Sequence, residues 1–100
     1  MALSLQQSQN YLGHDRWRWA VWVDGAQEEL DSIDYVMYVL HPTFHKPVRI
    51  VNDRTTNFRL ETSGWGAFTI RARATHRDGR ETELSHELLL LYPDGTATLA

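Results

Sequence analysis

The sequence of 100 residues contains no cysteine, only three prolines and no apolar segment of membrane-spanning length. Without cysteine, disulfide bonds and thiolate metal ligands are excluded, so the fold depends on packing. The leucine run at residues 88–91 has four residues, whereas a helix that crosses a membrane needs about 20. The start of the chain lacks the basic and apolar segments of a signal peptide. We therefore expect a cytoplasmic location and no membrane contact from this segment.

An excess of basic residues is also absent. Ten Lys and Arg residues stand against 13 Asp and Glu, which gives a formal net charge of −3. Proteins that bind DNA or RNA without sequence preference neutralise phosphates with a basic face, so we expect no nucleic-acid partner. A chain of this length that is 42% hydrophobic suits one compact domain with one core. The sequence therefore predicts a single domain over residues 1–100.

Long amphipathic helix patterns are missing too, and β patterns fill most of the chain. The odd positions of residues 17–23 are all large and apolar, which places them on one face of a strand. Residues 68–75 alternate apolar and polar side chains in the same way. Asp78-Gly79 is the strongest hairpin signal, and residues 83–91 are expected to return as the partner strand.

Two further segments complete the predicted fold. Residues 33–40 are apolar on both faces after Asp34, as in a central strand covered on both sides. Residues 26–32 fit either a helical turn or a loop. Six or seven short strands separated by turns favour an all-β fold, an immunoglobulin-like antiparallel β-sandwich.

The first motif that suggests a binding site follows the strand at residues 33–40. His41, Thr43 and Phe44 stand within four residues, and Pro42 cannot extend a sheet ladder, so the chain is expected to leave the sheet there. A structural interpretation makes Phe44 a plug at the end of the sandwich and His41 a buried core residue. A functional interpretation places all three side chains on a pocket.

The second motif is Gly64-Trp65-Gly66. Glycines on both sides of a tryptophan permit unusual backbone angles and let another chain approach the peptide groups closely. A tryptophan presented in this way favours a binding surface, and the alternative is a tight corner that buries Trp65.

Three separated segments in one order now show a resemblance to a known family. They are Trp19-Ala20-Val21-Trp22-Val23-Asp24-Gly25, then V-x-x-V-L-H-P-T-F-x-x-P at residues 36–47, then Ser63-Gly64-Trp65-Gly66-x-Phe68. Together they resemble a YEATS domain, with a core at about residues 17–92. Short loops and the absence of long basic stretches make the chain more similar to the prokaryotic branch of that family.

The resemblance implies a non-catalytic module whose loops read acetylated or crotonylated lysine. Phe44 and Trp65 match the two aromatic positions that enclose the acyl group. Thr43 matches a hydroxyl that bonds the acyl amide, and His41 matches the histidine that supports the pocket. The N–H of Trp65 matches the donor to the acyl carbonyl, with Gly64 and Gly66 leaving room for the ligand.

The chemistry of the side chains agrees with this assignment. Acylated lysine presents a neutral, flat amide that an aromatic slot, a hydroxyl and a backbone N–H satisfy. An unmodified lysine would have to desolvate its ammonium in the same slot, at a cost of several kcal/mol unless it is paired. We also expect a planar crotonyl chain to bind at least as well as acetyl, because it stacks between aromatic faces.

The chain departs from the family at one wall of the expected pocket. Relatives that act on chromatin add an aromatic residue from the loop before the first of these strands, where this chain has Asp15 with His14 and Trp17 as neighbours. Each of these three residues is a candidate for the additional wall. A more open slot, or a different ligand, is the alternative.

Signals for catalysis and for cofactors are lacking. There is no G-x-S-x-G nucleophile elbow and no Gly-rich phosphate loop, so we expect no enzyme activity and no cofactor. His41 and His45 are too weakly placed to predict a metal site, since Pro42 opposes a helix there. Two functions remain: a reader of an acylated-lysine peptide or protein, and an interaction or sensor domain, fused to effector domains, that binds no acyl-lysine.

Overall fold

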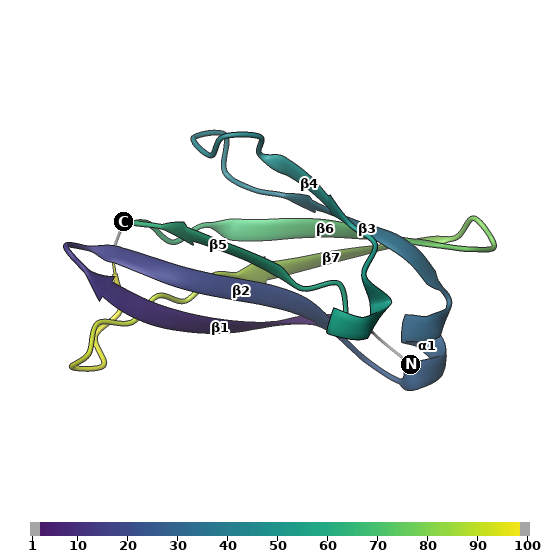
Figure 1. Cartoon of the computed structure of the whole chain (residues 1–100), viewed down its shortest axis with the longest axis horizontal. Coiled ribbons are helices and arrows are strands. Elements are labelled where there is room, and N and C mark those ends of the chain that lie inside the picture. Colours follow the sequence, from purple (N-terminus) through teal and green to yellow (C-terminus); the bar gives the residue numbers. More distant parts are fainter. Residues whose placement is uncertain (1–2, 99–100) are drawn as a thin grey trace.

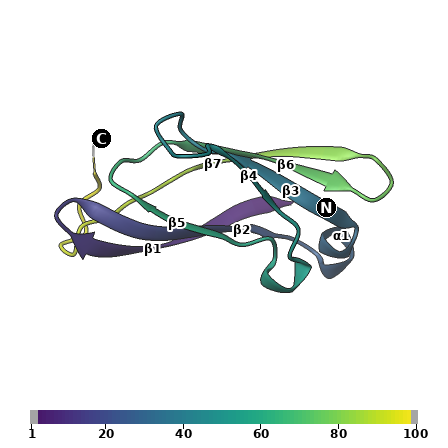
Figure 2. The same ribbon diagram turned by 45° about the horizontal axis from the view of Figure 1, so that its top comes forward.

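The computed structural model describes residues 3–98 of the chain, so the outermost ends of the predicted domain, residues 1–2 and 99–100, lie outside the described residues. The described residues form seven strands in two antiparallel sheets, which confirms the predicted β-sandwich. Figure 1 shows the two sheets as separate layers, and Figure 2 shows the same layers turned toward the viewer. Both sheets twist and pack face to face.

The first sheet contains three strands in the order β1-β2-β5. Their bounds are β1 Ser4–Gly13, β2 Arg16–Asp24 and β5 Leu60–Gly64. In β2 the tryptophans at 17 and 19 and the valines at 21 and 23 are all fully or almost fully buried, as the alternation predicted. Trp17 pairs with Gly64, so the start of β2 lies beside the end of β5.

The second sheet contains four strands in the order β4-β3-β6-β7. Their bounds are β3 Ile33–Val39, β4 Val48–Val51, β6 Thr69–His76 and β7 Glu81–Glu87. The Asp78-Gly79 hairpin joins β6 to β7 as predicted, with Gly79 at a φ of 92° that suits glycine.

Two expectations for this sheet are wrong. Strand β7 ends at Glu87, and after one further bond, from the N–H of Leu88 to the carbonyl of Phe68 at 3.0 Å, the chain leaves the ladder that was predicted to reach 91. Strand β3 is central, but only its inner face is buried, while Tyr35, Met37 and Val39 on the outer face are partly exposed. Apolar side chains on both faces therefore did not mean that both faces are covered.

Residues 88–91 are held instead by side chains of β1. The carboxamide of Gln7 accepts a hydrogen bond from the N–H of Leu89 at 2.8 Å and donates one to its carbonyl at 2.7 Å. Gln9 accepts from the N–H of Leu91 at 3.1 Å. Leu88 and Leu90 are thereby directed into the core. These glutamines close one long side of the sandwich.

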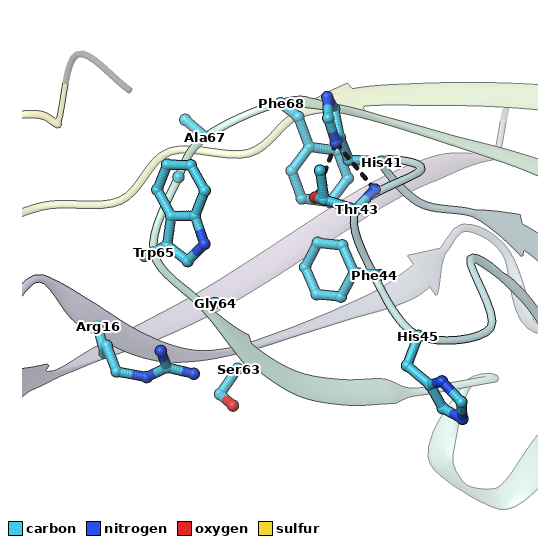
Figure 3. Close-up of a pocket in the computed structure, with 11 residues that line it drawn as sticks. Arg16, His41, Thr43, Phe44, His45, Ser63, Gly64, Trp65, Ala67 and Phe68 are labelled. Carbon is cyan, nitrogen blue, oxygen red and sulfur yellow. Dashed lines mark hydrogen bonds between the residues drawn. The ribbon is translucent and has the colours of Figure 1, made fainter.

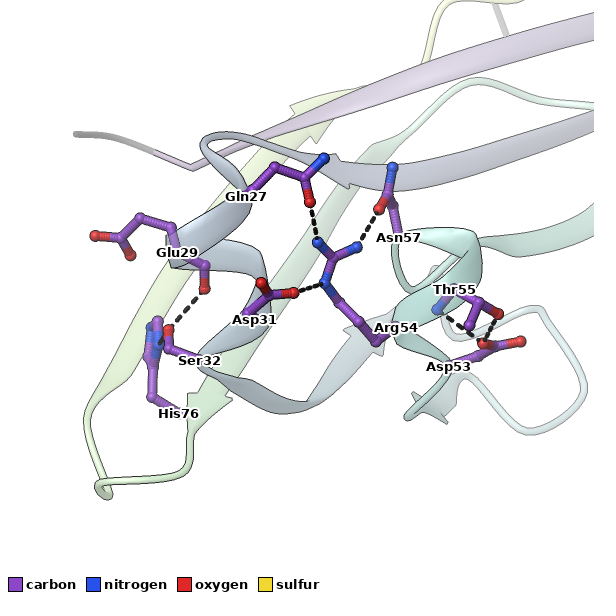
Figure 4. A network of polar contacts seen from close by, with 9 residues as sticks. All are labelled: Gln27, Glu29, Asp31, Ser32, Asp53, Arg54, Thr55, Asn57 and His76. Carbon is purple, nitrogen blue, oxygen red and sulfur yellow. Dashed lines mark hydrogen bonds and ion pairs between the residues drawn. The ribbon is translucent and has the colours of Figure 1, made fainter.

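The sequence left two possibilities for residues 26–32, a helical turn or a loop. The structure shows a short helix there, α1, at Gln27–Asp31. Figure 4 shows how Arg54, in the 3-10 helix η1 at Arg54–Thr56, ties α1 down. Its guanidinium donates to Asp31 at 2.8 Å, to Gln27 at 2.7 Å and to Asn57 at 2.8 Å. These contacts fix the end of the sandwich opposite to the loops at residues 41–46 and 64–68 (Figure 1).

Candidate ligand-binding site

A cavity of about 360 Å³ opens at the end of the sandwich where the loop after β3 meets the segment between β5 and β6 (Figure 3). Both sequence motifs line it. The lining residues are Arg16, His41, Thr43, Phe44, His45, Ser63, Gly64, Trp65, Gly66, Ala67 and Phe68. The structure thus brings together the six residues that the sequence placed on the site.

The first wall of the cavity is the loop at residues 41–46. Pro42 ends the ladder of β3, and the chain turns so that the N–H of Phe44 donates to the carbonyl of His41 at 3.0 Å. Arg49 on β4 donates to the carbonyls of His45 and Lys46, at 2.8 and 2.6 Å. The loop is therefore fixed from both of its ends.

The ring of Phe44 is half-buried and packed on two other aromatic rings. Its centroid lies 5.4 Å from that of Phe68 and 6.2 Å from that of Trp19, which is fully enclosed. Edge and tilted contacts of this kind fix ring orientation. Phe44 therefore serves as a rigid wall that also contacts the core.

The second wall is Trp65, whose side chain is 58% exposed. Figure 3 shows its indole and the phenyl ring of Phe44 on opposite sides of a gap, with Gly64 between them. We call this gap the slot. Accessibility was the observation expected to separate a pocket from a packed corner, and both Trp65 and Thr43 are exposed. This exposure favours the pocket.

The hydroxyl of Thr43 lies at the rim of the slot and has a defined orientation. The backbone N–H of Thr43 donates to Nδ1 of His41 at 3.3 Å, so this ring nitrogen is an unprotonated acceptor. The hydroxyl lies 2.9 Å from the same Nδ1 and forms a second hydrogen bond with it (Figure 3). The lone pairs of the Thr43 oxygen remain available to accept a hydrogen bond from a ligand.

The buried indole beneath the slot has one unusual feature. Nε1 of Trp19 is the single buried side-chain polar atom without a hydrogen-bond partner within residues 3–98. It lies 3.7 Å from the place that a Cβ atom would occupy on Gly64. An unpaired buried donor costs free energy, and here it lies close to Gly64, which the ring of Phe44 also approaches.

Comparison with known proteins identifies the family. A model of the prokaryotic YEATS domain matches residues 17–88. The chain belongs to the prokaryotic YEATS domain family. A relative from Schizosaccharomyces pombe, transcription initiation factor TFIID subunit 14, is 34% identical over 65 residues, which are 64% of this chain and 26% of that protein. The chain thus spans about a quarter of the length of that curated relative.

Solved structures of YEATS domains share the fold of this one. A Yaf9 YEATS domain recognising an H3K122suc peptide has a TM-score of 0.65 and 24% identity, with 96% of this chain and 72% of that chain covered. A Yaf9 YEATS domain bound to H3K27ac has a TM-score of 0.68 and 22% identity, with 96% and 75% covered. At this level of identity the likeness establishes the sandwich, and not the ligand.

The three candidates for an additional wall of this YEATS domain lie elsewhere. Trp17 is fully buried between Tyr11 and Tyr92, with ring centroids 5.1 and 5.0 Å away, and its Nε1 donates to the carbonyl of Leu91 at 2.8 Å. Asp15 accepts a hydrogen bond from the hydroxyl of Tyr92 at 2.8 Å. His14 is exposed in the turn between β1 and β2. None of the three lines the cavity.

Arg16 lines the cavity, whereas one of these three residues was expected to do so. The sequence did not identify Arg16 as a site residue. Strand alternation points Arg16 away from the core, opposite in direction to Trp17. Because Trp17 pairs with Gly64, residue 16 lies beside Trp65 at the cavity. The alternation was readable from the sequence, but the pairing of β2 with β5 was not.

The described residues hold no arrangement of three or more His, Cys, Asp or Glu side chains that would bind a metal ion. Within the same residues, no helix is long and apolar enough to cross a membrane. The cavity itself is lined by no Asp or Glu. Its polar groups are two hydroxyls, two imidazoles, one guanidinium, the indole N–H of Trp65 and peptide groups.

Proposed function

We propose that this YEATS domain is a non-catalytic reader that binds an acylated lysine side chain in the slot between Phe44 and Trp65. Thr43 accepts a hydrogen bond from the N–H of the acyl amide, and the N–H of Trp65 donates to its carbonyl. His41 orients Thr43, while Gly64 and Gly66 leave room for the ligand. The partner is a protein or peptide that carries such a lysine.

The observation that carries the proposal is the open slot with a half-buried aromatic ring on one side and an exposed one on the other. An exposed tryptophan on the rim of a cavity that other aromatic rings line is typical of a ligand-binding surface. The oriented hydroxyl of Thr43 adds a polar group at the rim. A flat, neutral amide satisfies both features.

The lining also accounts for rejection of unmodified lysine. An ammonium that enters an aromatic slot must be paired, because its desolvation costs several kcal/mol. No carboxylate lines the cavity to pair with it. Cation–π contact with Trp65 offers part of that free energy, but an exposed contact is worth only about 0.5–1 kcal/mol. Acylation removes the charge and with it the penalty.

Acylated histone peptides occur in the two Yaf9 structures with the same fold, which supports the ligand class proposed here. Crotonyl-lysine is expected to bind at least as tightly as acetyl-lysine, since a planar conjugated chain stacks on both rings of the slot. Weaker binding of crotonyl would remove this part of the proposal.

The test is calorimetric titration of the folded domain with three peptides that differ only in lysine, acetyl-lysine or crotonyl-lysine. We expect saturable binding of the acylated peptides alone. Trp65→Ala should abolish it without unfolding the domain, because Trp65 is largely exposed. Tryptophan fluorescence offers a second readout. A folded domain that binds none of the peptides at millimolar concentration would instead support an interaction or sensor domain without acyl-lysine binding.

A further inference from the structure

Two arginines stand next to the slot on the outer face of β2. Arg16 lines the cavity, and Arg18 lies two residues further along the same strand face, directly opposite Ser63, which also lines it. Figure 3 shows the guanidinium of Arg16 extending toward Ser63, with the indole of Trp65 farther away beyond Gly64. Both arginines are exposed. They form a local basic surface, here called the arginine pair.

Neither guanidinium of the arginine pair has a hydrogen-bond or ion-pair partner in the part of the chain that the structure describes. The carboxylates closest in sequence and register are engaged elsewhere. Asp15 accepts from the hydroxyl of Tyr92 at 2.8 Å, and Glu61, two residues along β5 from Ser63, pairs with Arg59 at 3.4 Å.

Several other arginines of the domain do have partners, although Arg71 and Arg77 also lack one among the described residues. Arg54, Arg73 and Arg80 each form an ion pair with a carboxylate at 3.0 Å or less. The domain carries a net charge of −3, so the positive surface beside the slot is local and does not follow from composition. Two neighbouring unpaired cations repel each other and would be stabilised by an anion.

We propose that the arginine pair is an anion-binding subsite. The ligand would then be an acylated lysine with a carboxylate close to it, and the arginine pair would bind that carboxylate. This inference rests on the function proposed above. The carboxylate has two sources with the same chemistry: an Asp or Glu side chain near the modified lysine, or the free end of a dicarboxylic acyl group such as succinyl. A lysine surrounded by basic residues is disfavoured, because no carboxylate of the cavity offsets the repulsion.

The expected gain is modest, since the arginines are exposed. One solvent-exposed ion pair strengthens binding about twofold to fivefold. Two guanidiniums around one carboxylate should bring the gain to about fivefold to tenfold at low salt. Salt screens charges beyond about 8 Å at physiological ionic strength, so the gain should shrink as salt is added, whereas aromatic stacking should not.

The experiment compares four peptides on the intact domain. One has acetyl-lysine with neutral neighbours, the second has Glu on both sides of the acetyl-lysine, the third has Lys on both sides, and the fourth has succinyl-lysine with neutral neighbours. Each is titrated at low and physiological salt. The variants are Arg16→Gln, Arg18→Gln and both together.

Arg71→Gln is the matched control. Arg71 is exposed, likewise has no side-chain partner among the described residues, and lies on the outer face of the other sheet, opposite Ser85 and Val39. It removes the same charge at a different place. Denaturation midpoints and the affinity for the neutral acetyl peptide show whether each variant keeps its fold and its slot.

We expect the Glu-flanked or the succinyl peptide to bind about fivefold to tenfold more tightly than the neutral acetyl peptide. The Lys-flanked peptide should be the weakest. If Arg16→Gln and the double variant lose this gain in affinity and Arg71→Gln keeps it, the result supports the subsite. The peptide that shows the gain, Glu-flanked or succinyl, identifies the source of the carboxylate.

Three other results would overturn the inference. Equal affinity for neutral, acidic and succinyl peptides would overturn the anion-binding subsite but not the proposed acyl-lysine reader. An equal loss in Arg71→Gln would attribute the gain to overall charge. Absence of binding by every acylated peptide would overturn the proposed reader and the subsite together.

Discussion

Gly64 and Phe44 approach each other so closely that a methyl group on residue 64 would fit only if the Phe44 ring moved by a few tenths of an ångström. A Cβ atom on residue 64 would lie 3.2 Å from Cζ and 3.7 Å from Cε1 of the Phe44 ring. The φ of Gly64 lies outside the left-handed region, so its backbone conformation is open to other residues. Any preference for glycine at this position therefore comes from the close approach of the Phe44 ring and not from the backbone angle.

Gly64→Ala is therefore expected to displace the ring of Phe44 by a few tenths of an ångström and to narrow or tilt one wall of the slot. Overpacking of this kind costs about 1–3 kcal/mol. We expect a lower denaturation midpoint and about tenfold weaker acyl-lysine binding, measured by urea denaturation and calorimetry. Ser85→Ala, on the exposed face of β7 and outside the cavity, is the control. Unchanged affinity in Gly64→Ala would show that the position of Phe44 does not set the slot.

Thr43→Val tests the hydroxyl at the rim. Valine keeps the shape of the side chain but leaves the amide N–H of a bound acyl-lysine without an acceptor, which costs about 1–3 kcal/mol when the group is buried. We expect about tenfold weaker binding and an unchanged fold, because Thr43 is exposed. Thr43→Ser retains the hydroxyl and should bind nearly as well as the original domain. Equal affinities in the two variants would contradict the role of the oxygen.

Gln7→Ala should loosen residues 88–91 from β1. The carboxamide bonds both peptide groups of Leu89, at 2.7 and 2.8 Å, and its oxygen also accepts from Nε2 of His86 at 2.6 Å. Losing this cluster is expected to cost about 1–3 kcal/mol of unfolding free energy. Faster hydrogen exchange at the N–H of Leu89 would localise the effect. Gln6→Ala, whose side chain faces solvent, should change neither quantity.

His86 should make stability depend on pH. Burial lowers the pKa of His86 below its ordinary value, although the charge of Glu87 acts in the opposite direction. Between that lowered pKa and about 6.5, the unfolded chain binds more protons at this position than the folded chain does. Stability at this site is therefore fully present above about pH 6.5 and falls as the pH is lowered through the window.

Denaturation midpoints at several values between pH 8 and pH 5 measure this dependence. His86→Gln keeps a donor toward Gln7 and removes the titration, so its midpoint should fall less steeply over the same range. A slope identical in the two proteins would assign the pH dependence to other groups.

The strands with a clear period of two could be predicted from the sequence. In β2 the inward positions of the alternation are apolar, and in β6 they are apolar as far as Ala74, with the buried His76 ending the strand; the outward positions of β6 are polar, so one face of each strand was readable directly. The hairpin at Asp78-Gly79 needed only local chemistry. His41, Thr43, Phe44 and Trp65 were predicted to share one site because their order and spacing resemble those of a family, and the structure places them on one cavity.

What the sequence did not reveal depends on which strands pair. Strand β1 is rich in glutamine and carries a weak β pattern, and its role follows from side-chain bonds to residues 89 and 91. Residues 88–91 are all leucine and have the composition of a buried strand, but they are bound by the side-chain carboxamides of two glutamines on β1. Arg16 was passed over in favour of Trp17 because an aromatic wall was expected, while the pairing with Gly64 directs Trp17 inward and Arg16 to the cavity.

The two residues that form the walls of the slot follow strands of different sheets. Phe44 follows β3 in the four-stranded sheet, and Trp65 follows β5 in the three-stranded sheet. Along one side of the sandwich, the glutamines of β1 join the two sheets. Along the opposite side, the edge strands β4 and β5 form no hydrogen-bonded ladder with each other. The width of the slot therefore depends on how the two sheets are held against each other, and under the proposed function we expect acyl-lysine affinity to fall when packing between the sheets is loosened.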